Sequence, residues 1–252
     1  MEDGIFTLKF GSKEVEFPKS KIKAFFDVVL KGESKTYNDH NWYTSGGLKG
    51  YIEGQSKTPY SKLSKPLSQY TIGDVRSFQS RSRDNVGQLW ATGRYQIIPD
   101  TLKGLISKAG LDESQPYNQE NQDKLAMQLL INRSSIRKYL KGEVPDTQQN
   151  LEAAALSMAQ IWSSVGVPYA MQGSKKRIQK NESYYSGGGD KATVKTEDVQ
   201  KALRELKNSY GKSEDSDEKK NDKKFSVGAA VLALLTTVSI YFLVTNYKSL
   251  KK

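Results

Sequence analysis

Residues 89–102 read Leu-Trp-Ala-Thr-Gly-Arg-Tyr-Gln-Ile-Ile-Pro-Asp-Thr-Leu, and the remainder of the chain is best understood outward from them. Pro99 suits the first turn of a helix, where its missing N–H has no intrahelical partner to lose. Gly110 provides a stop, so a helix is predicted from Pro99, with an inward face formed by Leu102, Leu105, Ile106 and Ala109. Tyr95 and Gln96 therefore lie just before a helix.

Tyr95 and Gln96 admit two interpretations. A sugar presents hydroxyl groups at its edge and a flat apolar face, so an amide beside an aromatic ring suits saccharide recognition. Alternatively, Tyr95 belongs to the core and Gln96 is an ordinary loop residue. The local pattern by itself favours neither interpretation.

The composition restricts the chemistry. The chain has 252 residues, which suits one ordinary domain with appendages, and a formal net charge of +11, which favours an anionic partner. No standard nucleic-acid module is recognisable, so we expect a membrane surface or a cell wall and no nucleic acid. With no cysteine and one histidine, neither a thiol nucleophile nor a zinc site of the usual His/Cys type is available, and no metal or cofactor is expected. His40 lies in what reads as a polar loop, which argues against a Ser–His–Asp triad, so carboxylates are the expected acid–base groups.

Four short segments, in order, resemble the lambda-type phage endolysins, which are lysozyme-like lytic transglycosylases. Residues 93–97 (GRYQI) are similar to a Gly-Arg-Tyr-Gln-Leu stretch of that family, and residues 25–34 (FFDVVLKGES) resemble its first helix and catalytic Glu. Residues 119–141 resemble its central helices, and residues 159–164 (AQIWSS) resemble its late Ile-Trp-Ala-Ser helix. The resemblance covers roughly residues 20–180 and implies a lysozyme-like domain of the α+β class, mainly α.

The resemblance places the catalytic acid at Glu33. The partial negative charge at the end of the preceding helix favours a protonated carboxyl group, as a general acid requires, whereas Lys31 and Lys35 favour the ionised form. Without the resemblance, Glu33 would read as a solvated residue of a lysine-rich turn. We expect the substrate to be bound by Ser34, Asp39, Thr92, Tyr95 and Gln96.

Two reaction types remain open. Lytic transglycosylases, as the resemblance implies, use one Glu, which protonates the glycosidic oxygen and then acts as base while the 6-hydroxyl of N-acetylmuramic acid closes a 1,6-anhydro ring. Most glycosidases use two carboxylates. A hydrolytic muramidase with Asp39 as the second carboxylate is therefore the alternative, and Glu53 is the other nearby candidate.

The N-terminal half has recognisable local signals. Alternating apolar residues predict a hairpin extension over residues 1–18, outside the resemblance. An apolar stripe predicts a helix that stops at Gly32, the stripe being Ile22, Phe25, Phe26, Val29 and Leu30. Residues 34–70, which are rich in Gly, Ser, Asn, Lys and Tyr, are expected to form short strands and one wall of a cleft.

Three further helices are predicted. Thr71 and Asp74 resemble a capping box, with Asp in place of Glu or Gln, ahead of a short helix. Apolar periodicity predicts one helix over about residues 118–140 and another over about residues 151–165. The catalytic domain is expected to span residues 19–180, so that a protein ending near Lys180 folds alone.

The remaining chain is expected to be an anchor. Residues 181–224 read as a flexible charged linker in which residues 194–210 form a short amphipathic helix. Residues 225–244 contain no charge and are long enough for one transmembrane helix, followed by a basic tail over residues 245–252. The polar, alternating N-terminus does not resemble a signal peptide. The expected protein is a single-pass membrane protein with a C-terminal anchor.

These observations lead to one functional hypothesis with three alternatives. The hypothesis is a membrane-anchored lytic transglycosylase of a virion that cleaves the MurNAc-GlcNAc bond when a phage enters its host. Its partners would be peptidoglycan glycan strands, the lipid membrane around its C-terminal helix and other virion proteins. The alternatives are a hydrolytic muramidase, a lysis protein of the host inner membrane acting at phage exit, and a non-catalytic membrane-anchored protein that binds the wall.

Overall fold

The computed structural model describes residues 4–10, 13–57, 59–60, 62–83, 85, 87–187 and 192–209. Nearly all of them belong to one compact unit, Met1–Asn208. No helix in this described part of the chain is long and apolar enough to cross a membrane. The predicted transmembrane helix over 225–244, the basic tail and residues 188–191 and 210–224 of the predicted charged linker lie outside the described residues.

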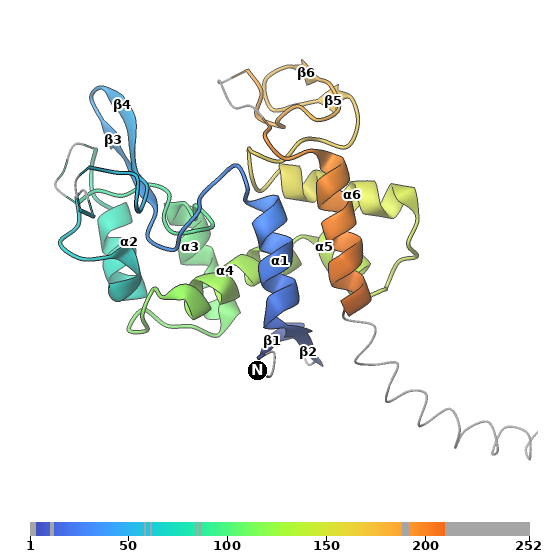
Figure 1. The fold of residues 1–252 in the computed structure, drawn as a ribbon, viewed down its shortest axis with the longest axis horizontal. Helices are drawn as coiled ribbons and strands as arrows, with labels where there is room; N and C mark the ends of the chain where they lie inside the picture. The colour runs from blue at the N-terminus through green and yellow to red at the C-terminus, as the bar shows by residue number, and fades with distance from the viewer. Residues whose placement is uncertain are drawn as a thin grey trace, which may run out of the picture. The chain divides into compact units, whose positions relative to one another are not determined.

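The N-terminal hairpin and the first helix form as predicted. Strands β1 (Ile5–Phe10) and β2 (Lys13–Pro18) pair antiparallel, with Ile5 opposite Pro18. Helix α1 (Lys19–Val29) follows directly, and its buried stripe is Ile22, Phe25, Phe26 and Val29. Figure 1 shows the hairpin at one end of α1, so the opposite, C-terminal end of this helix, which leads to Glu33, lies away from the hairpin.

The segment after α1 contains the second hairpin. Strands β3 (His40–Thr44) and β4 (Gly47–Tyr51) pair antiparallel, as expected for short strands within residues 34–70. A 3-10 turn, η1 (Leu67–Gln69), precedes helix α2 (Ile72–Gln79). The capping box is confirmed, because the Thr71 hydroxyl accepts from Asp74 N at 3.0 Å and the Asp74 carboxylate accepts from Thr71 N at 3.0 Å.

The helix predicted from Pro99 is also confirmed. Helix α3 (Pro99–Leu105) begins at the proline and continues into a 3-10 turn, η2 (Ser107–Ala109). Gly110 ends it with a φ of 69°, a left-handed conformation that glycine adopts at little cost. Leu102 and Leu105 are completely or almost completely buried.

The single helix expected over residues 118–140 is two helices, α4 (Gln119–Ile131) and α5 (Ser134–Leu140). Arg133 interrupts them with an extended backbone, φ −86° and ψ 112°. The break allows α5 to turn and pack against α6 (Gln148–Ala159). Apolar periodicity did not reveal the break at Arg133, because both helices have buried faces and the change of direction between them depends on packing. Helix α6 also ends earlier than the predicted Val165, although Trp162 is buried beyond it.

The folded unit extends past the predicted boundary at residue 180. A short hairpin of β5 (Met171–Gln172) and β6 (Arg177–Ile178) is followed by bridges that join Gly166 to Ser183 and Val165 to Val194. Residues 196–209 are helical, as the amphipathic pattern predicted, and they bury Val199, Ala202, Leu203 and Leu206. These residues are part of the core and not of a flexible linker, so the predicted boundary is wrong.

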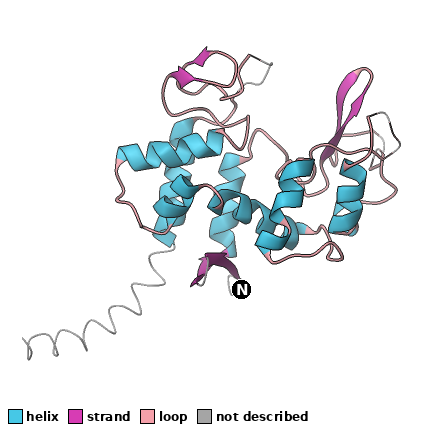
Figure 2. Cartoon of the chain, turned by 180° about the vertical axis from the view of Figure 1, so that it is seen from behind, coloured by secondary structure: helices cyan, strands magenta, loops and turns pink. Residues whose placement is uncertain are grey.

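The described residues therefore form an α+β fold that is mainly helical, with small two-stranded sheets, which confirms the α+β, mainly helical part of the predicted fold class. Figure 2 shows the helices gathered together, while the three hairpins project from them. In both ribbon views the β3–β4 and β5–β6 hairpins project at the end opposite the β1–β2 hairpin.

Candidate active site

Glu33 lies four residues beyond the last residue of α1, and its side chain is half-buried. One carboxylate oxygen, Oε1, accepts a hydrogen bond of 3.1 Å from the backbone N–H of Ser164. A backbone donor of this kind holds a carboxylate in one orientation. The structure thus anchors Glu33 against a segment that is 131 residues away in the sequence.

The same contact region includes the C-terminal part of the unit. The carbonyl of Ser164 accepts from Thr193 N at 2.8 Å and from Val194 N at 2.9 Å. Gly32 passes so close to Thr193 that any Cβ at Gly32 would clash with the Thr193 hydroxyl. Glycine at position 32 therefore permits the close packing that places Glu33 on Ser164.

Asp39 organises the loop after Glu33. Its carboxylate accepts five hydrogen bonds, from the Ser34 hydroxyl, the Lys35 and Thr36 amides, the Thr36 hydroxyl and the Glu53 amide. Burial by itself raises the pKa of Asp39, but these hydrogen bonds outweigh it and the pKa is lowered. The side chain is 3% exposed. The direct substrate contact predicted for Asp39 is therefore corrected, because its carboxylate is occupied in holding Ser34 and the loop.

The turn at residues 93–96 requires unusual backbone conformations. Gly93 has a φ of 72°, and a Cβ there would clash with the side-chain oxygen of Gln122, to which Arg94 N donates at 3.1 Å. Gln96 is half-exposed with a φ of 48°, which a non-glycine residue rarely adopts. Its amide donates to Gly93 O at 2.8 Å and accepts from Asn41 Nδ2 at 3.1 Å, so both ends of the amide group are held.

Thr92 and Tyr95 face the interior and not solvent. Tyr95 is 2% exposed and Thr92 is 0% exposed. The Tyr95 hydroxyl donates to Asp123 Oδ1 at 2.5 Å, and the Thr92 hydroxyl lies 3.0 Å from the hydroxyl of Tyr117. Their predicted contacts with substrate are therefore corrected: the core interpretation of Tyr95 is the one the structure supports. Ser34 and Gln96 are half-exposed, and their substrate contacts remain predictions.

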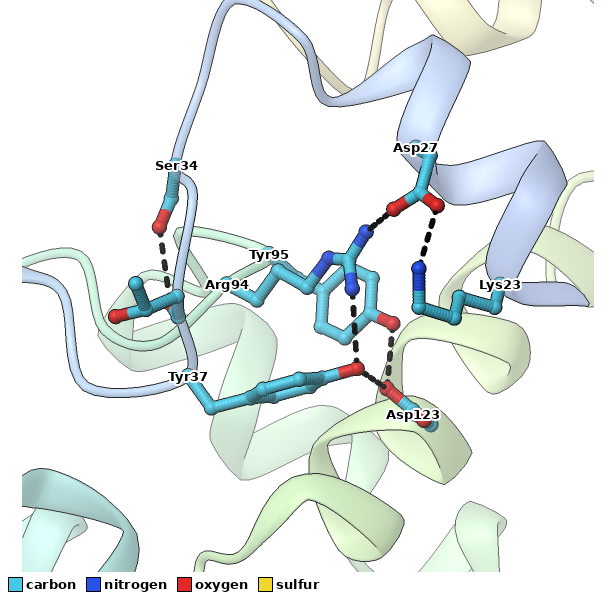
Figure 3. A network of polar contacts seen from close by, with 8 residues as sticks. Lys23, Asp27, Ser34, Tyr37, Arg94, Tyr95 and Asp123 are labelled. Carbon is cyan, nitrogen blue, oxygen red and sulfur yellow. Dashed lines mark hydrogen bonds and ion pairs between the residues drawn. The ribbon is translucent and has the colours of Figure 1, made fainter.

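A polar network behind this turn was not foreseen from the sequence. Figure 3 shows the Arg94 guanidinium between Asp27 of α1, with which it forms an ion pair, and the hydroxyl of Tyr37, to which it donates at 3.3 Å. Tyr37 in turn donates to Asp123 Oδ1 at 2.9 Å, beside the bond from Tyr95. The network therefore ties α1, the loop before β3, the turn at residues 93–96 and α4 to one another.

The two carboxylates of this network have opposite pKa shifts. Burial raises the pKa of Asp123, and the hydrogen bonds from Tyr95 and Tyr37 only partly offset it. Burial also acts to raise the pKa of Asp27, but there the hydrogen bonds and charges of Lys23 and Arg94 outweigh it, and the pKa is lowered. The ionised Asp27 is thus the partner of Arg94. Lys23 is a local partner of Asp27, four residues away on α1, but Arg94, Tyr37, Tyr95 and Asp123 come from distant segments, which explains why no local motif indicated the network.

The single histidine and the carboxylates provide no metal site among the described residues, since no group of three or more of these side chains is placed to hold an ion. His40 lies in β3, rather than in the polar loop expected, and is 2% exposed. Its ring stacks on Tyr51 with centroids 5.0 Å apart, and Nδ1 is 2.9 Å from Asn38 O. Burial lowers the pKa of His40, so this histidine is a neutral core residue near pH 7.

Comparison with family models, with curated proteins and with solved structures finds no match to this chain. The functional argument therefore rests on the site itself. The structure provides a carboxylate oriented at the end of a helix, a loop braced beside it by Asp39, and a turn in which Gln96 is held in a strained conformation.

Proposed function

We propose that this protein cleaves the MurNAc-GlcNAc bond of peptidoglycan, with Glu33 as the acid–base group, as a lytic transglycosylase. The observation that carries the proposal is the setting of Glu33. Its carboxylate is half-buried, and one oxygen is fixed by the Ser164 amide, while the second oxygen is free of that bond. A general acid needs this combination of fixed orientation and access.

The proposed reaction uses Glu33 twice. Its carboxyl group donates a proton to the glycosidic oxygen, and the bond from that oxygen to the anomeric carbon of N-acetylmuramic acid breaks. The resulting carboxylate then accepts the proton of the 6-hydroxyl of the same sugar, whose oxygen bonds to the anomeric carbon and closes the 1,6-anhydro ring. Glu33 ends the cycle protonated, and no water is consumed.

The environment of Asp39 favours this reaction over a two-carboxylate mechanism. A nucleophile or general base must offer a free lone pair to the sugar or to water, but the Asp39 carboxylate already accepts five hydrogen bonds. Glu53 is half-buried, and its Oε1 accepts from Asn38 Nδ2 at 2.8 Å. The hydrolytic muramidase remains the alternative, and its products differ from those of a transglycosylase.

Substitution of Glu33 tests the proposal directly. We expect Glu33→Gln to lower cleavage by about 10²–10⁴-fold or more, because Gln cannot transfer the proton. The variant keeps an oxygen that accepts from Ser164 N, so the free energy of unfolding should change by less than about 0.5 kcal/mol. The matched control is Glu53→Gln, which keeps its acceptor for Asn38 and should retain most of the activity.

The products decide among the candidate functions. Mass spectrometry of digested cell wall should show 1,6-anhydro ends. Reducing ends together with an equally damaging Asp39→Asn would instead identify a muramidase. If wall is bound but no product forms with the unmodified protein, the protein is the non-catalytic wall-binding alternative.

The cellular setting is part of the same proposal and rests on the sequence of residues 225–244. We assign the protein to the membrane of a virion that opens the wall at entry, because an enzyme tethered to a membrane cannot diffuse through the wall at release. The alternative is a lysis protein of the host inner membrane. Localisation of the full chain in purified virions or in host membranes separates the two.

A further inference from the structure

An aromatic pair that the site described above does not use is formed by Tyr43 of strand β3 and Trp90 of the neighbouring segment. Asn41 and Tyr43 lie two residues apart on β3, so their side chains are on the same face, about 6–7 Å apart. The ring of Tyr43 meets that of Trp90 edge to face, with centroids 5.3 Å apart and an interplanar angle of 62°. Both rings are half-exposed.

The backbone holds Trp90 at this position. Asn41 O accepts from Trp90 N at 2.7 Å, while Asn41 N donates to Ala91 O at 3.0 Å, so two residues lie opposite one as in a β-bulge. The Asn41 side chain also accepts from Ala91 N at 2.8 Å. Tyr43 N donates to the side chain of Gln88 at 2.9 Å, which fixes the other end of the segment. The aromatic pair is therefore built into the fold and is not a pair of loose surface rings.

Polar groups of two kinds border the pair. On one side, Asn41 Nδ2 donates to Gln96 Oε1 and Gln96 Nε2 donates to Gly93 O, so each amide nitrogen has a second hydrogen that these bonds do not use. On the other side, the exposed Arg83 guanidinium lies 4.3 Å from the centroid of Tyr43. None of the ion pairs among the described residues involves Arg83.

We infer that Gln96, Asn41, Tyr43, Trp90 and Arg83 form a saccharide-binding strip. The aromatic pair offers an apolar surface to the flat face of a pyranose ring, and the two amides donate to its hydroxyl or N-acetyl oxygens. Arg83 binds a carboxylate carried by the chain, such as that of a peptide substituent. The strip deepens the proposed function, on which it rests for the identity of the glycan as peptidoglycan.

The distribution of charge favours a saccharide over a nucleic acid. A polyphosphate strand needs a row of cations along its backbone in addition to stacked aromatic rings. Arg83 is the cation seen at this pair, whereas Lys49 and Lys62 lie near Trp42, on the other face of the hairpin. Lys49 is the cross-strand partner of Trp42, and Lys62 Nζ is 5.9 Å from the centroid of its ring.

The strip is tested by binding measurements that do not depend on catalysis. Isothermal titration of the full chain carrying Glu33→Gln with a hexamer of N-acetylglucosamine measures binding to the neutral sugar. We expect Trp90→Ala to weaken binding roughly tenfold, since one ring of the pair is lost, and Trp90→Phe to weaken it less. Lys49→Ala, on the opposite face, is the matched control and should bind as the parent does.

A second ligand tests Arg83. Arg83→Gln should weaken binding of a muropeptide with free carboxylates several-fold, and should leave binding of the neutral hexamer unchanged. Circular dichroism and thermal unfolding establish that each variant is folded, and the conservative Trp90→Phe keeps the test valid should Trp90→Ala unfold.

Three results would overturn the strip. The first is absence of hexamer binding by the parent, and the second is unchanged affinity in folded Trp90→Ala and Trp90→Phe variants. The third is that the parent binds a thymidine oligonucleotide more tightly than it binds either the hexamer or the muropeptide, and that Trp90→Ala abolishes this binding. These outcomes are distinct from failure of the proposed catalysis, which would appear as full wall cleavage by Glu33→Gln.

Discussion

Gln96 combines a strained backbone with an amide whose two ends are both held. A left-handed conformation at a non-glycine residue costs of order 1–3 kcal/mol and persists where the surroundings impose it. Here the surroundings are Gly93 and Asn41, which bind the amide from two sides. Such strain is common at functional sites, which agrees with a role for Gln96 in binding substrate.

Two substitutions of Gln96 separate strain from bonding. Gln96→Ala removes both amide bonds and keeps the strain, so the free energy of unfolding should fall by about 1–2 kcal/mol. Gln96→Gly removes the same bonds but relieves the strain, so it should be the more stable of the two. Urea unfolding measures this order. Both variants should also lose activity several-fold per folded molecule, and normal activity in both would make Gln96 purely structural.

The hydrogen bonds of Asp39 predict how the stability of the protein depends on pH. Its folded pKa is lowered, so its contribution to stability is fully present above the ordinary carboxyl pKa near 4 and is lost as pH falls through the folded value. Asp39→Asn should lower the free energy of unfolding by about 2–3 kcal/mol at pH 7. The substitution replaces one carboxylate oxygen, which accepts hydrogen bonds, with an NH2 group that faces the same donors and cannot accept from them. The difference in urea stability between the two proteins should shrink below about pH 4. A cost that is the same at pH 7 and pH 3 would contradict this role.

At the scale of elements, the contacts of Arg94 explain how α1 is held relative to the rest of the unit. The guanidinium joins Asp27 of α1 to Tyr37 of the following loop. Its Cζ atom also lies over the ring of Tyr37, 5.4 Å from the ring centroid. Glu33 lies between these two partners in the sequence. The network therefore braces both sides of the segment that carries the proposed acid.

Replacement of Arg94 by Lys tests this brace. Lysine keeps the charge but cannot bond Asp27 and Tyr37 at once in the planar geometry of a guanidinium. We expect Arg94→Lys to lower the free energy of unfolding by roughly 1–3 kcal/mol and to lower turnover more than it changes substrate affinity. Thermal unfolding and steady-state kinetics measure the two effects. Lys23→Gln is the control, because Lys23 is exposed and bonds only Asp27 among the pairs described here.

At the scale of the whole unit, residues 192–209 complete both the core and the site. Val194, Val199, Leu203 and Leu206 are at most 3% exposed. Burying such a side chain contributes about 1.5–3 kcal/mol, so the four together approach the 5–15 kcal/mol net stability of a typical protein. Thr193 and Val194 also bond Ser164, which holds Glu33.

Truncation distinguishes the two domain boundaries. A protein of residues 1–209 should be folded and active without detergent, whereas one of residues 1–180 should aggregate or lack a cooperative thermal transition. Circular dichroism melting and size-exclusion chromatography of the two proteins measure the difference. A stable, active 1–180 protein would restore the boundary that composition suggested and would show that residues 192–209 are dispensable.

Local physical chemistry determined a large part of this fold. The apolar stripe of α1, the Thr71–Asp74 cap and the proline start of α3 were predictable, because each depends on residues within a few positions of one another. The mainly helical class of the described unit follows from periodicity in the same way, and the lack of any cysteine thiol is read directly from the composition.

Packing between distant segments decided the rest. The buried Tyr95 hydroxyl donates to Asp123, the Asp39 carboxylate accepts the hydrogen bonds that hold its loop, and Glu33 accepts from the amide of Ser164. The same cause ended the long predicted helix at Arg133 and moved the domain boundary beyond residue 180. Periodicity in the sequence shows which face of a helix or strand is apolar. The packing of these apolar faces then decides which distant segments meet, and only that decides which groups a polar side chain contacts.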